Sequence, residues 1–187
     1  MTVYMLRMVQ CSALALGLMG SPNCYADDAP SLPERKAGLW DMTTTMDEGK
    51  GPKVYTLKMC IDATMEATTV KSSIVEHKAS CESYDIKKTD TGTAVDYVCK
   101  FNGRNVTSHT DMTGDFKSAF LVKITSKTSG NMDKMKGMPE EMAKQAAATT
   151  VVINRTITQD GKYLGENCGD LKGGEAMGPD GQKVAVQ

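Results

Sequence analysis

Short runs of alternating apolar and polar residues recur along most of the chain. Two of them cover residues 40–46 and 55–61, and Gly49, Gly51 and Pro52 lie between them. Because successive side chains of a strand point to opposite faces of a sheet, each run predicts a strand with one buried face. The two glycines and the proline predict the turn that joins these strands.

From Cys81 onwards the alternation continues, interrupted by turn residues at 90–92, 102–103 and 114–115. A final long strand is predicted from about residue 151, with a turn at Asp160-Gly161. Strands that return through tight turns form antiparallel pairs. The predicted fold class is therefore mainly β, a single antiparallel meander that forms a strongly curved sheet or a small barrel.

Two stretches break this pattern and predict short helices. Residues 62–76 open with Asp62, whose carboxylate can cap a helix N-terminus. The second stretch begins at Pro139, which is tolerated in a first helical turn, and continues with glutamates and alanines. We therefore expect one or two short helices beside the sheet.

The first 26 residues have the features of a secretory signal. Arg7 precedes an uncharged, mostly apolar stretch at 8–20, and Cys24-Tyr25-Ala26 supplies a cleavage pattern before Asp27. The apolar stretch is shorter than the roughly 20 residues of a membrane-spanning helix, so no transmembrane segment is expected after cleavage. The expected organisation is a cleaved signal at 1–26, a flexible N-terminus at 27–34, an antiparallel β domain at 35–169 and a disordered, glycine-rich tail at 170–187.

Removal of the signal leaves 21 basic and 23 acidic residues, a net charge of −2. This balance provides no basic field for nucleic acid. Four cysteines remain, and an even number in an exported chain predicts two disulfides and a bacterial periplasmic or secreted location. Their wide spacing is unlike the close pairs of zinc sites. The four are Cys60, Cys81, Cys99 and Cys168.

The sequence contains no motif typical of catalysis. It lacks the nucleophile elbow, the zinc-protease motif, the phosphate-binding loop and the dinucleotide glycine pattern. Its histidines, His77 and His109, lie in charged or polar stretches and are predicted to be exposed. We therefore expect a protein that is not an enzyme and needs no cofactor.

A methionine cluster allows two interpretations. Its spacing places the thioethers on one helical face, where they would fill gaps against the sheet. Thioethers in an oxidising compartment also bind Cu(I), which makes copper binding a minor alternative. Gly137 and Pro139 interrupt a continuous helix, and this favours packing. The cluster consists of Met132, Met135, Met138 and Met142.

Three segments carry a family resemblance: RKAGLW at 35–40, KMCIDATMEA at 58–67 and GKYLGENC at 161–168. Together with the order of the four cysteines, they resemble a bacterial periplasmic family known as domain of unknown function number 3617. The resemblance covers residues 35–169. It implies a fold and a compartment, but no reaction.

Hairpin geometry selects among the possible disulfides. A hairpin centred on Asp90 places Cys81 opposite Cys99, and the remaining two cysteines then pair. The better apolar match, Tyr84 opposite Tyr97, would instead put the first two cysteines on opposite faces. Both conditions hold only if a β-bulge lies near the base of the hairpin. The expected disulfides are then Cys81 to Cys99 and Cys60 to Cys168.

Two non-catalytic roles fit these features. The first is a carrier or sensor that binds an apolar small ligand or lipid inside the curved sheet, in a cavity lined by Trp40, Met42, Tyr55, Leu57 and Met59. The second is a structural or protein-interaction module of the cell envelope. A filled interior with an exposed apolar patch or a free sheet edge would favour the second role.

Overall fold

The computed structural model describes residues 31–101, 104–131 and 139–186. The predicted signal at 1–26 lies outside these ranges, as do residues 27–30 and three members of the methionine cluster, Met132, Met135 and Met138.

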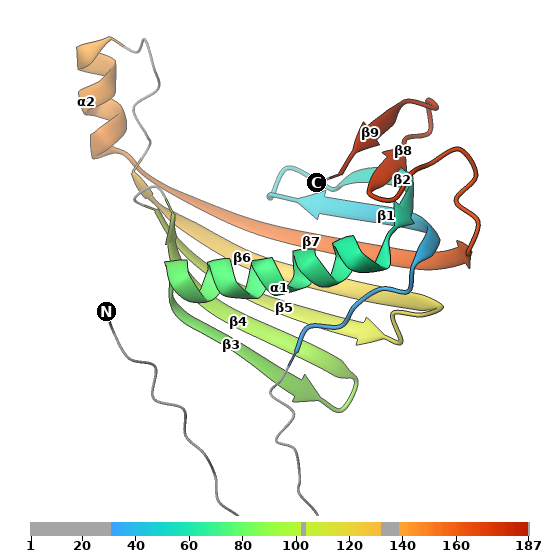
Figure 1. The fold of residues 1–187 in the computed structure, drawn as a ribbon. Helices are drawn as coiled ribbons and strands as arrows, with labels where there is room; N and C mark the ends of the chain where they lie inside the picture. The colour runs from blue at the N-terminus through green and yellow to red at the C-terminus, as the bar shows by residue number, and fades with distance from the viewer. Residues whose placement is uncertain (1–30, 102–103, 132–138, 187) are drawn as a thin grey trace, which may run out of the picture.

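Nine antiparallel strands form one sheet within the described residues, so the predicted fold class is confirmed. The sheet curls strongly but is not closed: β3 lies at one edge and β9 at the other, which makes it a curved sheet and not a barrel (Figure 1). The order across the sheet is β3-β4-β5-β6-β7-β1-β2-β8-β9. The strands are β1 (Gly38–Asp47), β2 (Lys53–Ile61), β3 (Cys81–Thr89), β4 (Gly92–Phe101), β5 (Arg104–Gly114), β6 (Ala119–Asn131), β7 (Thr150–Gly165), β8 (Glu175–Met177) and β9 (Lys183–Ala185).

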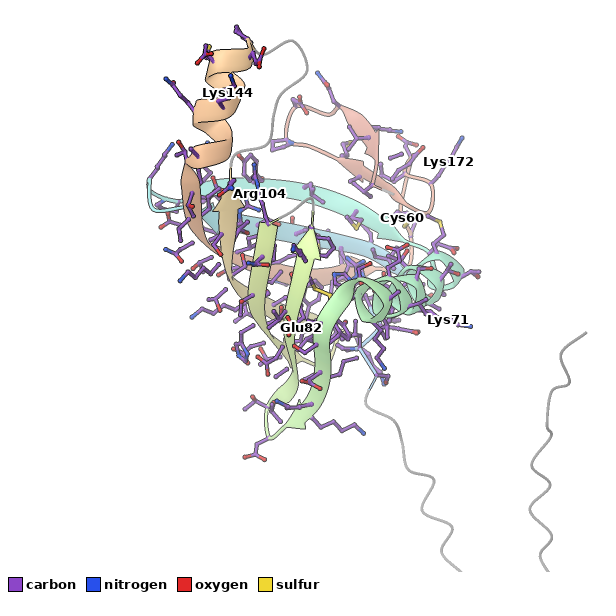
Figure 2. All side chains as sticks on the ribbon, turned by 90° about the vertical axis from the view of Figure 1, so that its left-hand side faces the viewer. Cys60, Lys71, Glu82, Arg104, Lys144 and Lys172 are labelled. Carbon is purple, nitrogen blue, oxygen red and sulfur yellow. A yellow bond between two sulfur atoms is a disulfide. The ribbon has the colours of Figure 1, made fainter. Side chains whose placement is uncertain are left out.

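Both predicted helices are present. The first, α1 (Ala63–Ser80), begins where predicted, because the Asp62 side chain accepts a hydrogen bond of 3.0 Å from the backbone N–H of Met65. It connects β2 to the edge strand β3 and lies beside β3 and β4 (Figure 2). The second, α2 (Glu140–Ala148), connects β6 to β7 and projects beyond their ends (Figure 1).

Both expected disulfides are present, Cys60 to Cys168 and Cys81 to Cys99. The register of the β3–β4 hairpin satisfies both conditions set by the sequence. Cys81 lies opposite Cys99 and Tyr84 lies opposite Tyr97, and the register shifts by one residue between Cys81 and Ser83. This shift is the β-bulge that the two pairings required.

The hydrophobic core fills one end of the curl, around Trp40. Its indole ring is fully buried and contacts the rings of Phe120 and Tyr163, each with centroids 5.4 Å apart. The indole N–H donates a 2.7 Å hydrogen bond to the backbone carbonyl of Lys36, so the polar atom of this buried side chain is satisfied. The rest of the buried cluster is Met42, Ile61 and Phe116.

Two expectations from the sequence are wrong. No turn forms at Asp160-Gly161, since β7 continues through both residues to Gly165. The glycine has another role: the Phe120 ring occupies the space that a side chain would take at residue 161. The tail at 170–187, expected to be disordered, instead forms β8 and β9 in its described part. Ala176 explains this order: it pairs with Met59 of β2 and is fully buried.

Candidate functional site

Among the described residues, packed side chains fill the space around Trp40 where a ligand cavity was predicted. Trp40 and Met42 are buried completely, and Leu57 and Met59 pack against the same core. Tyr55 is 53% exposed and takes no part in the cluster. The five residues predicted to line a ligand cavity therefore form core and surface in the described structure, and they do not line one shared cavity.

A groove of about 940 Å³ crosses β4, β5, β6 and β7 beside the turn between β1 and β2. Its volume lies within the range of roughly 300 to 1,000 Å³ that is usual for small-molecule sites. Charged, polar and aliphatic residues all contribute to its lining.

The strand register brings eight of the groove residues together in two rows that lie on one face of the sheet. The first row is Asp96, His109, Thr125 and Thr156, and the second is Val98, Thr107, Lys127 and Asn154. Alternation along β7 places Thr156 on the opposite face of the sheet from Tyr163, which packs on Trp40. The side chains of both rows therefore lie on the face that the hydrophobic core leaves uncovered.

His109 is held between two carboxylates at one side of the groove. Its Nδ1 lies 2.6 Å from Asp96 Oδ1, and its Nε2 lies 3.2 Å from Asp111 Oδ2. The hydrogen bond with Asp96 is the largest effect on His109 and raises its pKa. Desolvation opposes this increase, and the negative charge of Asp111 adds a smaller one. The same hydrogen bond lowers the pKa of Asp96. The three groups form a charge-assisted cluster that fixes the imidazole ring.

The other charged residues of the groove divide into paired and unpaired groups. Arg155 donates from Nε to Glu48 Oε1 over 2.6 Å, so these two charges balance each other. Lys50 and Lys127 also line the groove, and neither has an ion pair or side-chain hydrogen bond with any described residue. Lys50 and Lys127 therefore face the groove without an ion-pair partner among the described residues, and so does Asp47, whose carboxylate accepts a hydrogen bond from the backbone N–H of Gly49.

This site is not apparent from the sequence. His109 is exposed, as predicted, with 47% of its side chain accessible, but the sequence pattern alone does not identify both of its carboxylate partners. Asp111 follows it at the same-face spacing of two residues, a signal that was available, whereas Asp96 is brought beside it only by the pairing of β4 with β5. His77 is not a freely exposed side chain, since its ring packs against Tyr84 and Tyr97 at 5.4 and 5.5 Å.

The described part of the chain contains no cluster of three or more His, Cys, Asp or Glu side chains able to hold a metal ion. Of the four methionines considered for copper, Met142 alone is described, and it is 57% exposed on α2. Among the same residues, no helix is long and apolar enough to cross a membrane.

A family model described as "Protein of unknown function (DUF3617)" matches residues 35–168. No curated protein and no solved structure matches the chain.

Proposed function

Since the chain belongs to this family, whose description names no activity, we propose a function from the site itself: the domain binds an anionic amphiphile in the groove, without catalysis. By an anionic amphiphile we mean a molecule with an apolar body and one negatively charged group. This proposal keeps the expected class of ligand, an apolar small molecule or lipid, and moves its site from the Trp40 end of the sheet to the opposite face.

One observation carries the proposal: a groove of ligand size combines unpaired positive charge with apolar walls. Lys50 and Lys127 supply the charge, and Val98 and Val152 supply apolar surface on the same lining. Val152 is 52% exposed, so an apolar body lying against it would remove hydrophobic surface from water. A carboxylate or phosphate group at the lysines would gain the partner that the protein does not provide.

The disulfides support a proposal for the compartment. Two disulfides are typical of proteins that fold in an oxidising environment. We propose the bacterial periplasm as the place of function, where an amphiphile would come from the envelope. Copper binding stays a prediction, since three of its four candidate ligands lie outside the described residues.

The experiment compares two probes with the same chain and opposite head-group charge, dodecanoate and dodecyltrimethylammonium, by isothermal titration calorimetry below their aggregation concentrations. Dodecanoate should bind more tightly. Replacing both groove lysines, Lys50→Gln with Lys127→Gln, should weaken dodecanoate about three- to tenfold, since each exposed charge contact contributes up to about 1 kcal/mol.

Lys123→Gln is the matched control. Lys123 lies on the same strand and face as Lys127, but it is not part of the groove lining. It should leave the dodecanoate affinity within about twofold of the wild type. Equal binding of the two probes, or equal losses in the control and the double variant, would refute the proposal. Native mass spectrometry of protein purified from the periplasm would show a retained amphiphile as added mass.

A further inference from the structure

On the side away from β1, strand β2 is only partly covered. Its neighbour β8 pairs with two of its residues, Lys58 and Met59. The remainder of β2, Lys53–Leu57, has no strand partner on that side within the described residues. We call these five residues the free edge.

Backbone direction identifies which groups the free edge presents. The carbonyl of Cys60 accepts a 2.9 Å hydrogen bond from the N–H of Gly174, so Cys60 turns its backbone polar groups away from β1. The direction of the backbone N–H and carbonyl groups alternates from one residue to the next along an antiparallel strand. Val54 and Thr56 are separated from Cys60 by even numbers of residues, so their N–H and carbonyl groups also point away from β1. Two N–H groups and two carbonyls are available to an incoming strand.

The free edge lacks the protection that the opposite edge of the sheet has. In β3, four of the nine residues are charged, which is a common defence of an edge against pairing with other chains. The free edge carries one charge, Lys53, and two apolar side chains with large exposed fractions, 60% for Val54 and 53% for Tyr55. These features are typical of an edge that accepts a partner strand.

A hollow of about 280 Å³ lies at the end of the free edge, where β8 and β9 begin to cover the sheet. Thr56, Leu57 and Lys58 form its wall on β2, Gly178 and Pro179 form its wall on the turn between β8 and β9, and Asp41 of β1 also lines it. A strand laid along the free edge would place a side chain in this hollow. Backbone pairing would supply affinity, and the hollow would supply selectivity.

We propose that the free edge binds an extended peptide segment of another protein by strand addition. The segment would place an apolar side chain in the hollow and an acidic residue near Lys53, which is exposed and forms no ion pair with a described residue. Lys58 is a weaker attraction for an acid, because Asp41 lies opposite it on β1. This site is distinct from the groove, because none of the free-edge residues lines it.

A second copy of this chain fits the free edge less well than a peptide. If two copies paired antiparallel about Tyr55 over all five residues, Pro52 and Gly51 of the second copy would fall opposite Lys58 and Met59. Those places are held by Met177 and Ala176 of β8. A peptide segment can end or turn away before it reaches β8, whereas the second copy would have to displace it.

The test begins with a displayed library of random nine-residue peptides selected on the wild-type protein, followed by synthesis of the enriched peptides. They should share alternating apolar residues and at least one acid. Thr56→Pro removes an outward N–H without breaking the pairing of β2 with β1, and it should weaken peptide binding at least tenfold. Thr56→Ala keeps the N–H and should change the affinity less than threefold.

Hydrogen exchange on the wild-type protein tests the same site independently of any variant. The Val54 and Thr56 amides should exchange rapidly in the free protein and at least tenfold more slowly with the peptide bound. Failure to enrich any peptide, or equal binding by the proline variant, would overturn the proposal. A dimer in native mass spectrometry that Thr56→Pro dissociates would also overturn it, and would identify a second copy as the occupant.

Discussion

The phenyl ring of Phe120 lies directly over the backbone of Gly161. These residues pair across β6 and β7, and a β-carbon added at residue 161 would stand 2.3 Å from the nearest ring atom, Cε1. Glycine is therefore required here because of close packing, although the same residue in sequence suggested a turn. The contact also places the ring beside Trp40, at the centre of the core.

The first prediction tests that contact. Gly161→Ala should destabilise the protein by about 1 to 3 kcal/mol, because the ring has to move from a packed position. In a Phe120→Leu background the added methyl group meets a smaller side chain, and the same change should cost less than about 1 kcal/mol. Urea unfolding of the four proteins in this cycle measures the coupling. Equal costs in both backgrounds would show that residues 120 and 161 do not interact energetically.

The second prediction concerns the ion pair between Arg35 and Glu66. Glu66 is 7% exposed, and Arg35 donates to it from Nε over 2.8 Å and from the terminal nitrogen Nη2 over 2.7 Å. Burial alone would raise the pKa of Glu66, but the hydrogen bonds and charge of Arg35 lower it. Arg35→Met should cost about 2 to 3 kcal/mol at neutral pH, because it leaves a buried carboxylate without its partner.

The pH dependence of this loss has a definite sign. A carboxyl group whose pKa is lowered by folding contributes stability above its unfolded pKa, about 4.3, and that stability is lost as the pH falls through the folded pKa. The difference in unfolding free energy between wild type and Arg35→Met should therefore shrink at low pH. A difference that is constant between pH 7 and pH 3 would assign the loss to packing of the arginine side chain.

The third prediction concerns His109. Its pKa, followed by NMR, should lie above the ordinary value of about 6.5, and Asp96→Asn should lower it. Because folding raises this pKa, the stabilisation is fully present below about pH 6.5 and is lost as the pH rises through the folded value. Asp111→Asn is the matched comparison and should lower the pKa less, since its contact is longer. If the pKa of His109 is unchanged in Asp96→Asn, the hydrogen bond between His109 and Asp96 does not form in solution.

The fourth prediction compares the two disulfides. Cys60 and Cys168 are 108 residues apart in sequence, whereas Cys81 and Cys99 are 18 apart within one hairpin. Loop-closure entropy in the unfolded chain makes the long bridge worth about 4.7 kcal/mol and the short one about 3. The Cys60→Ser, Cys168→Ser variant should therefore lose about 1 to 2 kcal/mol more than the Cys81→Ser, Cys99→Ser variant.

Denaturant midpoints of these two double variants provide the measurement, and far-ultraviolet circular dichroism is the control that both retain the sheet. Equal losses would mean that packing of the long strands holds the sheet and the long bridge adds little. Peptide mapping without reduction comes first, because both variants presuppose the connectivity.

The sequence by itself determined most of the strands, the pairing of strands that tight turns join, and the Cys81 to Cys99 disulfide, from which the second disulfide followed by elimination. Alternation of apolar and polar residues selects the strand period, and tight turns force consecutive strands to pair, so both features are local. Cysteine spacing and aromatic pairing in one hairpin even required the bulge that is found after Cys81. These properties depend on residues close to one another in the chain.

Only the tertiary structure showed which side chains from distant segments of the chain contact each other. In the sequence Gly161 predicts a turn, but in the structure it makes room for the Phe120 ring. The composition of the tail predicts disorder, but Ala176 of the tail is buried beside Met59. The predicted ligand cavity is filled for the same reason, because Trp40 meets partners from β6 and β7 that alternation along β1 does not reveal. The groove and the free edge likewise depend on how strands far apart in sequence align and where that alignment ends.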